Sequence, residues 1–419
     1  MLRSSPQYGA NERGVRREDE EAPRYIRITD IDRNGQLIPG VGVTAEYADP
    51  RYKVQTNDLL IARSGNTVGK SLFIETDENA IFAGYLIRFR IDPTRIQPRY
   101  VFIFTQLPIY WKWIEATRRL TGQPNVNAEE YGRLELPEPP SDVQARVIER
   151  YDAALRTYKG KVTEADVLLG SIDDYLLAEL GINLPQESED KIDKRMFRAK
   201  ASDLGGWRFD ARVHQYDFGL QSATHPNAKL GTICAINPKT VFRGLSDTDD
   251  VSFVPMDAIS DRLGIIEKRE TRSLSENAGY TSFREGDLLW AKITPCMENG
   301  KSAVAEGLHR SFGYGSTEYH VLRSPDGSLD MGYLHALLRM KRVRKAAVRF
   351  FTGASGHQRV DADFLRTLEL PIPPLGVQKL LAAEARARVA EAVQLEEEAN
   401  AELERAKAHI EAILVGDSV

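Results

Sequence analysis

The segment Leu134-Glu-Leu-Pro-Glu-Pro-Pro-Ser-Asp-Val-Gln144 returns later in the chain as Leu368-Glu-Leu-Pro-Ile-Pro-Pro-Leu-Gly-Val-Gln378. Matching segments precede both copies in the same order. They are Asp58–Arg63 with Asp287–Lys292, Gly69–Ser71 with Gly300–Ser302, and Thr121–Gly122 with Thr352–Gly353. The copies lie much further apart than the roughly 20 to 50 residues of a solenoid repeat. The sequence therefore predicts a duplicated module, with two similar globular heads that are each followed by one long helix.

A chain of 419 residues is long enough to form two hydrophobic cores. Its cysteines, Cys234 and Cys296, lack the spacing of a disulfide framework or a zinc site, so the sequence favours a reducing compartment and predicts a cytoplasmic protein. No run reaches the ~18 apolar residues that a membrane span requires, and we expect no membrane partner.

The first long helix is predicted to begin near Ser141, because Ser141 and Gln144 follow a proline-rich segment and have the spacing of a capping box. Its apolar residues alternate in steps of three and four, the pattern of a coiled-coil seam, and Gly181 ends the helix. The seam residues are Ile148, Tyr151, Leu155, Tyr158, Val162, Ala165, Leu169, Ile172 and Leu176.

The second long helix has a thinner seam, rich in alanine and interrupted at Glu396. Its seam residues are Ala382, Ala385, Val389, Ala392, Ala399, Leu403, Ala406, Ile410 and Ile413. Small residues let a partner helix approach closely, so we expect the two helices to form an antiparallel pair with one head at either end. The alternative is that each helix packs on its own head. A helix of about 40 residues would be roughly 60 Å long.

Each head is predicted to combine short strands with a helix, because short apolar or alternating runs are separated by Gly, Asn, Asp and Pro. The expected strands are 25–31, 58–62, 71–75 and 85–91 in the first head, and 287–291, 302–306 and 319–323 in the second. A helix is expected at about 100–120 and again at about 332–349.

The expected fold class is α+β, with two similar mixed α/β domains joined by two long antiparallel coiled-coil helices. The predicted boundaries are 1–137 for the first head, 138–181 for the first helix, 182–206 for a polar linker, 207–371 for the second head and 372–419 for the second helix.

The net charge is −5, but the acidic residues concentrate in the two long helices, which leaves the heads slightly basic. Basic residues gather near the ends of the predicted head helices and could neutralise phosphates. The alternative is a solvated helix face. Related clusters in both copies favour phosphate contact. The clusters are Arg118 with Arg119, and Lys341, Arg342, Arg344 and Lys345 with Arg349.

The candidate enzyme motifs in the sequence lack the residue types or the residue spacing that those motifs require. Ser64–Ser71 resembles a phosphate-binding loop, but only three residues separate Gly65 from Gly69, where the motif GxxxxGK[ST] needs four. The second copy has no first glycine at all. The sequence also lacks GxSxG and HExxH motifs and any histidine with repeated ligand spacing. We therefore expect no catalytic residue, no metal site and no cofactor.

The aromatic stretch Ile109–Ile114 contains Trp111 and Trp113, which could stack on bases. A packed core face is the favoured interpretation.

In the second head the matching strand is followed by the loop Lys292-Ile-Thr-Pro-Cys-Met-Glu-Asn-Gly-Lys301, the stretch Gly313–Arg323, a Thr-Gly turn, and Leu-Pro-Ile-Pro-Pro before a long helix. This order, together with its duplication, resembles the target recognition domain and spacer helix of the specificity subunits of type I restriction-modification systems. The resemblance covers nearly the whole chain and is strongest in the second head.

The resemblance implies a subunit without catalytic activity that reads a split target in double-stranded DNA, one half with each recognition domain. It further implies that the helices dock two adenine methyltransferase subunits and, in restriction complexes, a translocating nuclease subunit. The alternative is the specificity subunit of another methyltransferase-based anti-phage defence system.

The chain departs from the family pattern at its start. The second module has a leading segment, from Gly206–Asp210 through Lys229–Cys234, for which we find no counterpart before the first head. We therefore expect a misplaced start, a trimmed first head, or a C-terminal tail that fills the gap.

The candidate base-reading segments are the turns Thr121–Asn127 and Thr352–Arg359, because Gln and Asn can pair with adenine and Arg with guanine. Such turns can also simply join a helix to a strand. The predicted DNA-contacting residues are Lys70, Arg118, Arg119, Gln123, Asn125, Lys292, Lys301, Lys341, Arg342, Arg344, Lys345, His357, Gln358 and Arg359. The predicted partner-docking and spacer residues are Tyr151, Leu155, Tyr158, Val162, Leu169, Ile172, Val389, Leu403 and Ile410.

Overall fold

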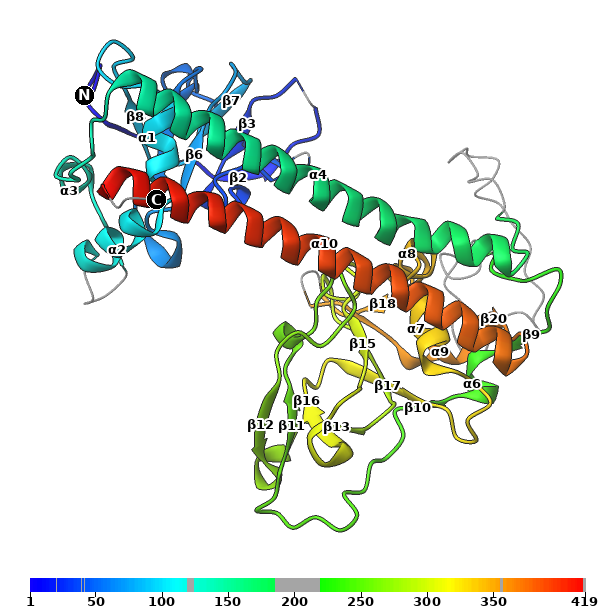
Figure 1. Cartoon of the computed structure of the whole chain (residues 1–419). Helices are drawn as coiled ribbons and strands as arrows, with labels where there is room; N and C mark the ends of the chain where they lie inside the picture. The colour runs from blue at the N-terminus through cyan, green and yellow to red at the C-terminus, as the bar shows by residue number, and fades with distance from the viewer. Residues whose placement is uncertain are drawn as a thin grey trace. The chain divides into compact units, whose positions relative to one another are not determined.

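The computed structural model describes residues 1–19, 21–38, 40, 42–118, 124–184, 219–354 and 357–416. The chain divides into two units, residues Met1–Val162 with Glu396–Val419 (unit 1) and residues Thr163–Leu395 (unit 2). Two long helices, α4 (Ser141–Glu179) and α10 (Leu375–Val415), each contribute one half to either unit (Figure 1). None of the helices in the described ranges is long and apolar enough to cross a membrane.

Unit 1 is built around a four-stranded antiparallel sheet. Its order is β1 (Gln7–Tyr8), β8 (Leu86–Arg90), β5 (Asp58–Ala62) and β6 (Ser71–Phe73). Two smaller pairs are β2 (Gly14–Arg16) with β4 (Val43–Ala45), and β3 (Arg24–Ile26) parallel to β7 (Ala80–Phe82). The helices of the head are α1 (Pro98–Phe104), α2 (Pro108–Thr117) and α3 (Ala128–Tyr131), with 3-10 turns at Ile28–Asp30, Pro50–Tyr52 and Gly65–Thr67.

Unit 2 repeats this sheet and has a second sheet of four strands. The repeated sheet has the order β10 (Ala235–Ile236), β17 (Tyr319–Arg323), β14 (Leu288–Ala291) and β15 (Ser302–Val304). The second has the order β12 (Glu270–Ser273), β11 (Asp250–Val254), β16 (Phe312–Gly315) and β13 (Thr281–Arg284). The remaining elements are β9 (Asn227–Lys229) with β20 (Glu369–Pro371), β18 (Phe351–Thr352) with β19 (Arg359–Val360), α6 (Leu230–Ile233), α7 (Met331–Arg339), α8 (Lys341–Val348), α9 (Ala362–Thr367), and 3-10 turns at Met256–Ala258, Leu274–Asn277 and His309–Ser311.

The duplication predicted from the sequence is confirmed by the matching order β1-β8-β5-β6 and β10-β17-β14-β15. Each unit also has a parallel strand pair outside this sheet, β3 with β7 in unit 1 and β11 with β16 in unit 2. The strands expected at 58–62, 71–75, 85–91, 287–291, 302–306 and 319–323 are confirmed as β5, β6, β8, β14, β15 and β17. The strand expected at 25–31 stops at Ile26, because a 3-10 turn begins at Ile28.

The single long helix expected in each head is wrong, because each breaks into two. In unit 1, Pro108 occupies the first turn of α2, and its missing N–H and fixed φ favour a new start there. In unit 2, Met340 has φ −51° and ψ 135°, outside the helical region, and separates α7 from α8. No proline marks this second break, so the sequence gives little warning of it.

Unit 1 has a counterpart of β10, but none of β9 among its described residues. Strand β1 lies on the same edge of β8 that β10 occupies on β17 in unit 2. The β9 and β20 pair has no counterpart among the described residues of unit 1, where 133–140 form neither helix nor strand. The leading segment expected to lack a counterpart contains β9, and the described residues of unit 1 hold no equivalent of its pairing with β20, whereas β10 lies just after that segment.

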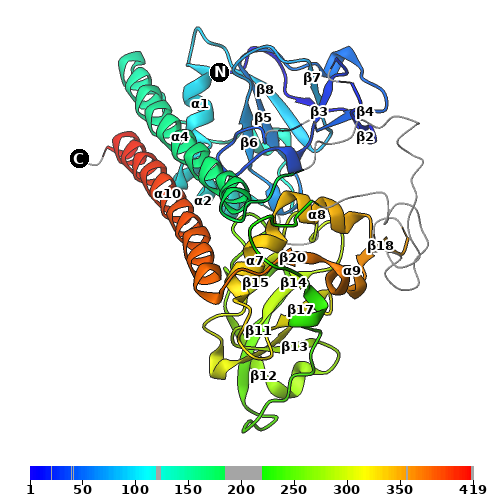
Figure 2. The same cartoon turned by 90° about the vertical axis from the view of Figure 1, so that its right-hand side faces the viewer.

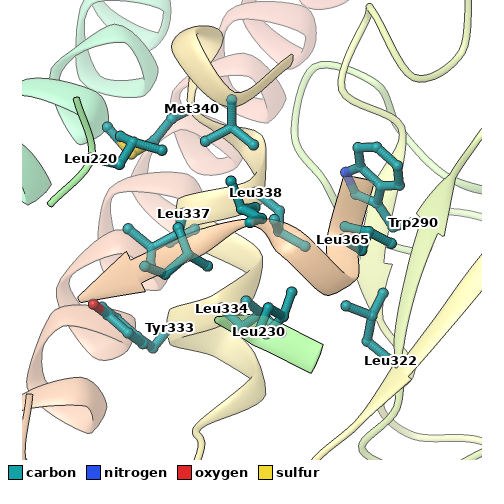
Figure 3. Packing of buried hydrophobic residues seen from close by; sticks show 14 of the residues in the cluster. Leu220, Leu230, Trp290, Leu322, Tyr333, Leu334, Leu337, Leu338, Met340 and Leu365 are labelled. Carbon is teal, nitrogen blue, oxygen red and sulfur yellow. The ribbon is translucent and has the colours of Figure 1, made fainter. Parts of the chain in front are cut away.

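Helix α4 and helix α10 both enter the core of each unit. In unit 1, Tyr151 and Leu155 of α4 share a hydrophobic cluster with Leu403 and Ile410 of α10 and with the head. In unit 2, α4 contributes Leu176, and α10 contributes Leu381, Ala382 and Ala385. The alternative in which each helix packs only on its own head is therefore wrong. Figure 3 shows the unit 2 core, where Leu334, Leu337 and Leu338 of α7 pack near Leu230 and Leu365.

The two helices also contact one another within each unit, beside one another in both views (Figure 1 and Figure 2). Lys161 Nζ lies 2.7 Å from Glu398 Oε2 in unit 1, and Arg388 Nη1 donates to Ser171 O at 2.9 Å in unit 2. The start of α4 thus meets the end of α10 in unit 1, and the reverse holds in unit 2, as an antiparallel arrangement requires. A continuous coiled coil between the heads stays a prediction.

The predicted seam is mostly buried, with one error at its end. Ala165, Ala392 and Ala399 are fully buried although they belong to no hydrophobic cluster of the heads, which indicates close helix contact. Ile413 is 36% exposed, so the seam prediction is wrong there, and Leu414 packs against the unit 1 core instead.

The repeated proline segments form the joint between each head and its long helix. Gln144 accepts a hydrogen bond from the Gln97 backbone N–H at 3.0 Å and donates to Pro139 O at 2.9 Å. The capping box predicted from Ser141 and Gln144 is therefore wrong, because the Gln144 side chain caps the start of α1 instead of α4.

Gln378 repeats both bonds in unit 2. It accepts from the Asp330 backbone N–H at 2.8 Å and donates to Pro373 O at 2.9 Å. A tyrosine hydroxyl completes each joint: Tyr100 donates to Pro137 O at 3.0 Å and Tyr333 to Pro371 O at 2.8 Å. The repeated sequence thus encodes a fixed attachment of helix to head.

Candidate nucleic-acid interface

Three chain segments meet at one place in unit 1: the end of β5, the start of β8 and the loop before α3. The Arg63 N–H donates to Tyr85 O at 2.9 Å, the Val126 N–H donates to Arg63 O at 2.9 Å, and the Gly65 N–H donates to Pro124 O at 2.9 Å. Backbone bonds of this kind fix a loop on a rigid sheet, where exposed side chains can read a ligand.

The same three bonds recur in unit 2. The Lys292 N–H donates to Glu318 O at 2.9 Å, the Val360 N–H donates to Lys292 O at 2.8 Å, and the Thr294 N–H donates to Gln358 O at 3.0 Å. Arg63, Tyr85 and Asn125 of unit 1 therefore correspond to Lys292, Glu318 and Arg359 of unit 2. These six residues are called the loop sites, three in each unit.

Sequence reasoning found half of the loop-site residues. It named Asn125, Lys292 and Arg359, and it missed Arg63, Tyr85 and Glu318. The repeat alignment itself placed Arg63 opposite Lys292 and could have identified it. Tyr85 and Glu318 differ in chemistry, so no sequence signal links them, and only the backbone bonds show that they are equivalent.

The unit 1 loop site combines charge with an exposed aromatic ring. The Arg63 guanidinium lies 4.9 Å from the centre of the Tyr8 ring, and Tyr85 is 55% exposed. Arg63 Nε and Asn125 Oδ1 are buried and lack a hydrogen-bond partner among the residues that the structure describes. Stacking on Tyr8 holds the Arg63 side chain in place, and the unpartnered polar atoms of Arg63 and Asn125 are unusual for buried groups.

The unit 2 loop site contains a two-pronged ion pair. Arg359 donates from Nε to Glu318 Oε2 at 2.8 Å and from Nη2 to Glu318 Oε1 at 2.6 Å. The neighbouring Arg359 guanidinium lowers the pKa of the Glu318 carboxyl, first by hydrogen bonding and then by its charge. His357 O accepts a third hydrogen bond, from Arg359 Nη1, at 3.0 Å.

Lys70 and Lys301, predicted to contact DNA, hold equivalent positions inside their heads. Lys70 Nζ donates to Ile31 O at 2.8 Å, and Lys301 Nζ donates to Met256 O and Ile259 O at 3.0 Å each. Each lysine therefore ties its glycine-lysine turn to a 3-10 turn of the same head. The glycines before them have φ of +91° at Gly69 and +85° at Gly300, a backbone conformation that L side chains rarely adopt.

The basic clusters occupy different parts of their helices. Arg118 is the exposed C-cap of α2, and its counterpart in unit 2 is Arg349, the C-cap of α8. Lys341, Arg342 and Arg344 instead lie in the first turn of α8, and Lys345 lies in its last turn. Arg344 Nη1 donates to Glu298 O at 2.6 Å, and burial lowers the pKa of Arg344. Arg342 and Lys345 also have interaction partners.

The other predicted readers are placed only in part. Arg119 and Gln123 lie outside the described residues. His357 is exposed and Gln358 is half-buried, with the Gln358 carbonyl fixed by Thr294. Trp113 stacks with Tyr110 at a ring distance of 6.4 Å, and Tyr110 and Ile114 are buried, so the core interpretation holds for this stretch except at Trp111, which is 36% exposed.

A cavity of about 890 Å³ lies in unit 2 between the head and its halves of α4 and α10. His335 and Arg339 line it, but both are committed to the backbone: His335 Nε2 lies 3.1 Å from Ser302 O and Arg339 Nη1 donates to Gly300 O at 2.6 Å. Within the described ranges, no group of three or more His, Cys, Asp or Glu side chains is placed to hold a metal ion.

Residues 227–405, which include the unit 2 loop site, match the family model for the type I restriction modification DNA specificity domain. The chain is 36% identical over 146 residues to the type I restriction enzyme EcoEI specificity subunit of Escherichia coli, and 32% identical over 186 residues to the EcoAI specificity subunit of the same organism. These matches cover 35% and 44% of this chain and span 24% and 31% of the relatives. A chain from a solved structure of the type I R-M system is 16% identical, with complete coverage of both chains (100% and 100%) and a TM-score of 0.49.

The family-model match and the two curated relatives agree with one another. Residues 227–405 are therefore similar to the DNA specificity domain of type I restriction-modification systems, and the chain resembles type I specificity subunits over part of its length.

Proposed function

We propose that this protein is a non-catalytic subunit that reads a bipartite sequence in double-stranded DNA, one half with each head, and docks two adenine methyltransferase subunits through its long helices. In a restriction complex, a translocating nuclease subunit would join them. The recurrence of one loop site in both units, built by the same three backbone hydrogen bonds, is the observation that carries this proposal.

A repeated scaffold with different side chains is what a split target requires. The scaffold is the same in both units, but Arg63, Tyr85 and Asn125 in one and Lys292, Glu318 and Arg359 in the other present different donors and acceptors. Each base pair shows its own donor and acceptor pattern in the major groove, so two different sites would read two different half-sites.

The phosphate contacts of the free chain are expected to be weak. The net charge is −5, and several basic side chains near the loop sites are engaged within their own heads. We therefore expect the free protein to bind duplex DNA weakly, with an affinity that falls steeply with ionic strength, and to become specific in complex with its methyltransferase. Tight binding by the lone chain that salt does not weaken would contradict this part of the proposal.

The test is a map of methylated adenines in host DNA with and without the gene. We expect methylation at a bipartite sequence that disappears when the gene is deleted and returns when it is restored. Exchange of residues 207–371 for the corresponding head of a relative should then change one half-site and leave the other unchanged. Unaltered methylation after deletion, or a change in both halves after the exchange, would contradict the proposed function.

A further inference from the structure

The Arg359 side chain is fixed in place although it lies at the surface. Arg359 donates hydrogen bonds from Nε and Nη2 to the Glu318 carboxylate and from Nη1 to His357 O. The Arg359 side chain is nevertheless 45% exposed, whereas the Glu318 side chain is only 21% exposed. The Glu318 backbone is fixed too, because its carbonyl accepts from the Lys292 N–H and its own N–H donates to Ser316 Oγ at 3.2 Å. A long surface side chain is usually free to change rotamer, so these contacts reduce the entropy that binding would otherwise cost.

The arginine retains donors for a ligand. A guanidinium has five N–H groups. Glu318 and His357 engage one N–H on each of the three nitrogens. Among the described residues, one N–H on Nη1 and one on Nη2 have no protein acceptor. In the major groove a guanine presents two acceptors, O6 and N7. Two N–H groups on neighbouring nitrogens of an arginine can donate to them.

The ion pair favours hydrogen bonding to a base over binding to a phosphate. A phosphate contact depends on net positive charge. The Glu318 carboxylate cancels the charge of Arg359 at close range, so the pair offers little net attraction to a phosphate. Its directional donors are unaffected, and these are what a base edge recognises.

We propose that Arg359 reads a guanine in the half-site of unit 2 and that Glu318 is the positioning residue that holds its guanidinium toward the base. This inference rests on the proposed function. In unit 1 the equivalent positions hold Asn125 and Tyr85, which cannot form such an ion pair. The proposal therefore concerns only the half-site that unit 2 reads.

The experiment maps the sequences methylated by the intact complex carrying each single variant. Arg359→Lys keeps the positive charge but removes the planar pair of donors, and Glu318→Gln keeps the size but removes the charge that fixes the arginine. We expect both variants to lose discrimination, on the order of tenfold, at one guanine in the unit 2 half-site. Every other position, including the whole unit 1 half-site, should stay as in the wild type.

A matched ion pair in the same head provides the control. Arg310 Nη1 lies 2.8 Å from Asp249 Oδ1, with side chains 46% and 24% exposed, close to the values for Arg359 and Glu318. Arg310→Lys and Asp249→Asn should leave the methylated sequence unchanged.

Three results would overturn the inference. The first is a uniform loss of methylation at all sites with Arg359→Lys, which would show that the arginine does not act at a single base. The second is an unchanged sequence in both test variants, and the third is an equal relaxation in the control variants. Failure of the proposed function looks different, because wild-type methylation would then not depend on the gene at all.

Discussion

The Asp287 carboxylate accepts two hydrogen bonds from the Arg323 guanidinium inside unit 2, from Nε to Oδ1 at 2.7 Å and from Nη2 to Oδ2 at 2.6 Å. Asp58 and Arg90 form the corresponding pair in unit 1, where Arg90 Nε lies 2.9 Å from Asp58 Oδ1. In both units the carboxylate also accepts a backbone N–H from the preceding turn, Arg284 in unit 2 and Gln55 in unit 1. The pair therefore ties the central strand of each repeated sheet to its neighbour.

Asp287→Asn should destabilise unit 2 strongly. Asp287 is only 1% exposed, and its loss leaves the Arg323 charge poorly compensated in a partly buried site. Removing one partner of a buried pair typically costs about 3–5 kcal/mol, and the partial exposure of Arg323 places the expected loss near the lower end. Denaturant unfolding measures it. Asp257→Asn, which breaks an exposed pair with Lys268, should cost less than about 1 kcal/mol. Equal losses in the two variants would show that Asp287 has no special role.

The glutamine joints give a second prediction. Gln378→Ala leaves the Asp330 N–H and the Pro373 carbonyl without the partners they have now, at a place where the glutamine is 1% exposed. Unsatisfied buried groups cost about 1–3 kcal/mol each, so we expect the free energy of unfolding to fall by roughly 2 kcal/mol.

The neighbouring exposed Lys379 supplies the control for the joint, since Lys379→Ala should change stability by less than about 0.5 kcal/mol. If Gln378→Ala were as stable as this control, the joint would contribute nothing to the attachment of α10.

The repeat and its strands were readable from the sequence, because alternating apolar residues and repeated motifs report local structure directly. Side-chain roles were not. Lys70 resembles a phosphate ligand in a glycine-lysine turn, and only the position of Ile31 O, 39 residues away, shows that it supports its own head. Glu318 and Arg359 are 41 residues apart, and they meet because both of their chain segments bond to the backbone of Lys292. Such relations depend on the folded register and have no local signature.

His335 predicts a dependence of stability on pH. Burial, followed by the charge of Arg339, lowers the pKa of His335 to about 3, and Arg386 acts in the same direction. An unfolded histidine has a pKa near 6.5. Between these values the unfolded chain binds a proton that the folded chain refuses, so stability is full above about pH 6.5 and falls as the pH is lowered, by about 1 kcal/mol per pH unit.

The measurement is the free energy of unfolding at pH 7.5 and 5.5 for the wild type and for His335→Gln. Glutamine can still donate to Ser302 O but does not titrate in this range, so the variant should lose about 1 kcal/mol less than the wild type between the two pH values. Parallel losses in the two proteins would assign the acid sensitivity to other groups.

Ala392 tests the contact between the long helices without disturbing a head. It is fully buried but belongs to no head cluster, so a larger side chain there should push α4 and α10 apart at a cost of about 1–3 kcal/mol. We expect Ala392→Leu to reduce methylation by the complex, measured against Ala401→Leu on an exposed position of the same helix. Full activity in the Ala392 variant would mean that the close helix approach is dispensable.

The length of the helices gives the last prediction, which belongs to the proposed bipartite reading. Helix α4 has 39 residues and helix α10 has 41. Deleting one heptad from each, at residues 159–165 and 394–400, shortens both by roughly 10 Å while keeping the seam in phase. The unread gap between half-sites should shrink by about three base pairs at ~3.4 Å each, and the half-site sequences should stay the same. A five-residue deletion from each helix would instead rotate the following part by about 140° and should abolish methylation, because the seam no longer faces its partner. If the heptad deletion left the gap at its original length, or if both deletions behaved alike, the helices could not be what sets the spacing of the target.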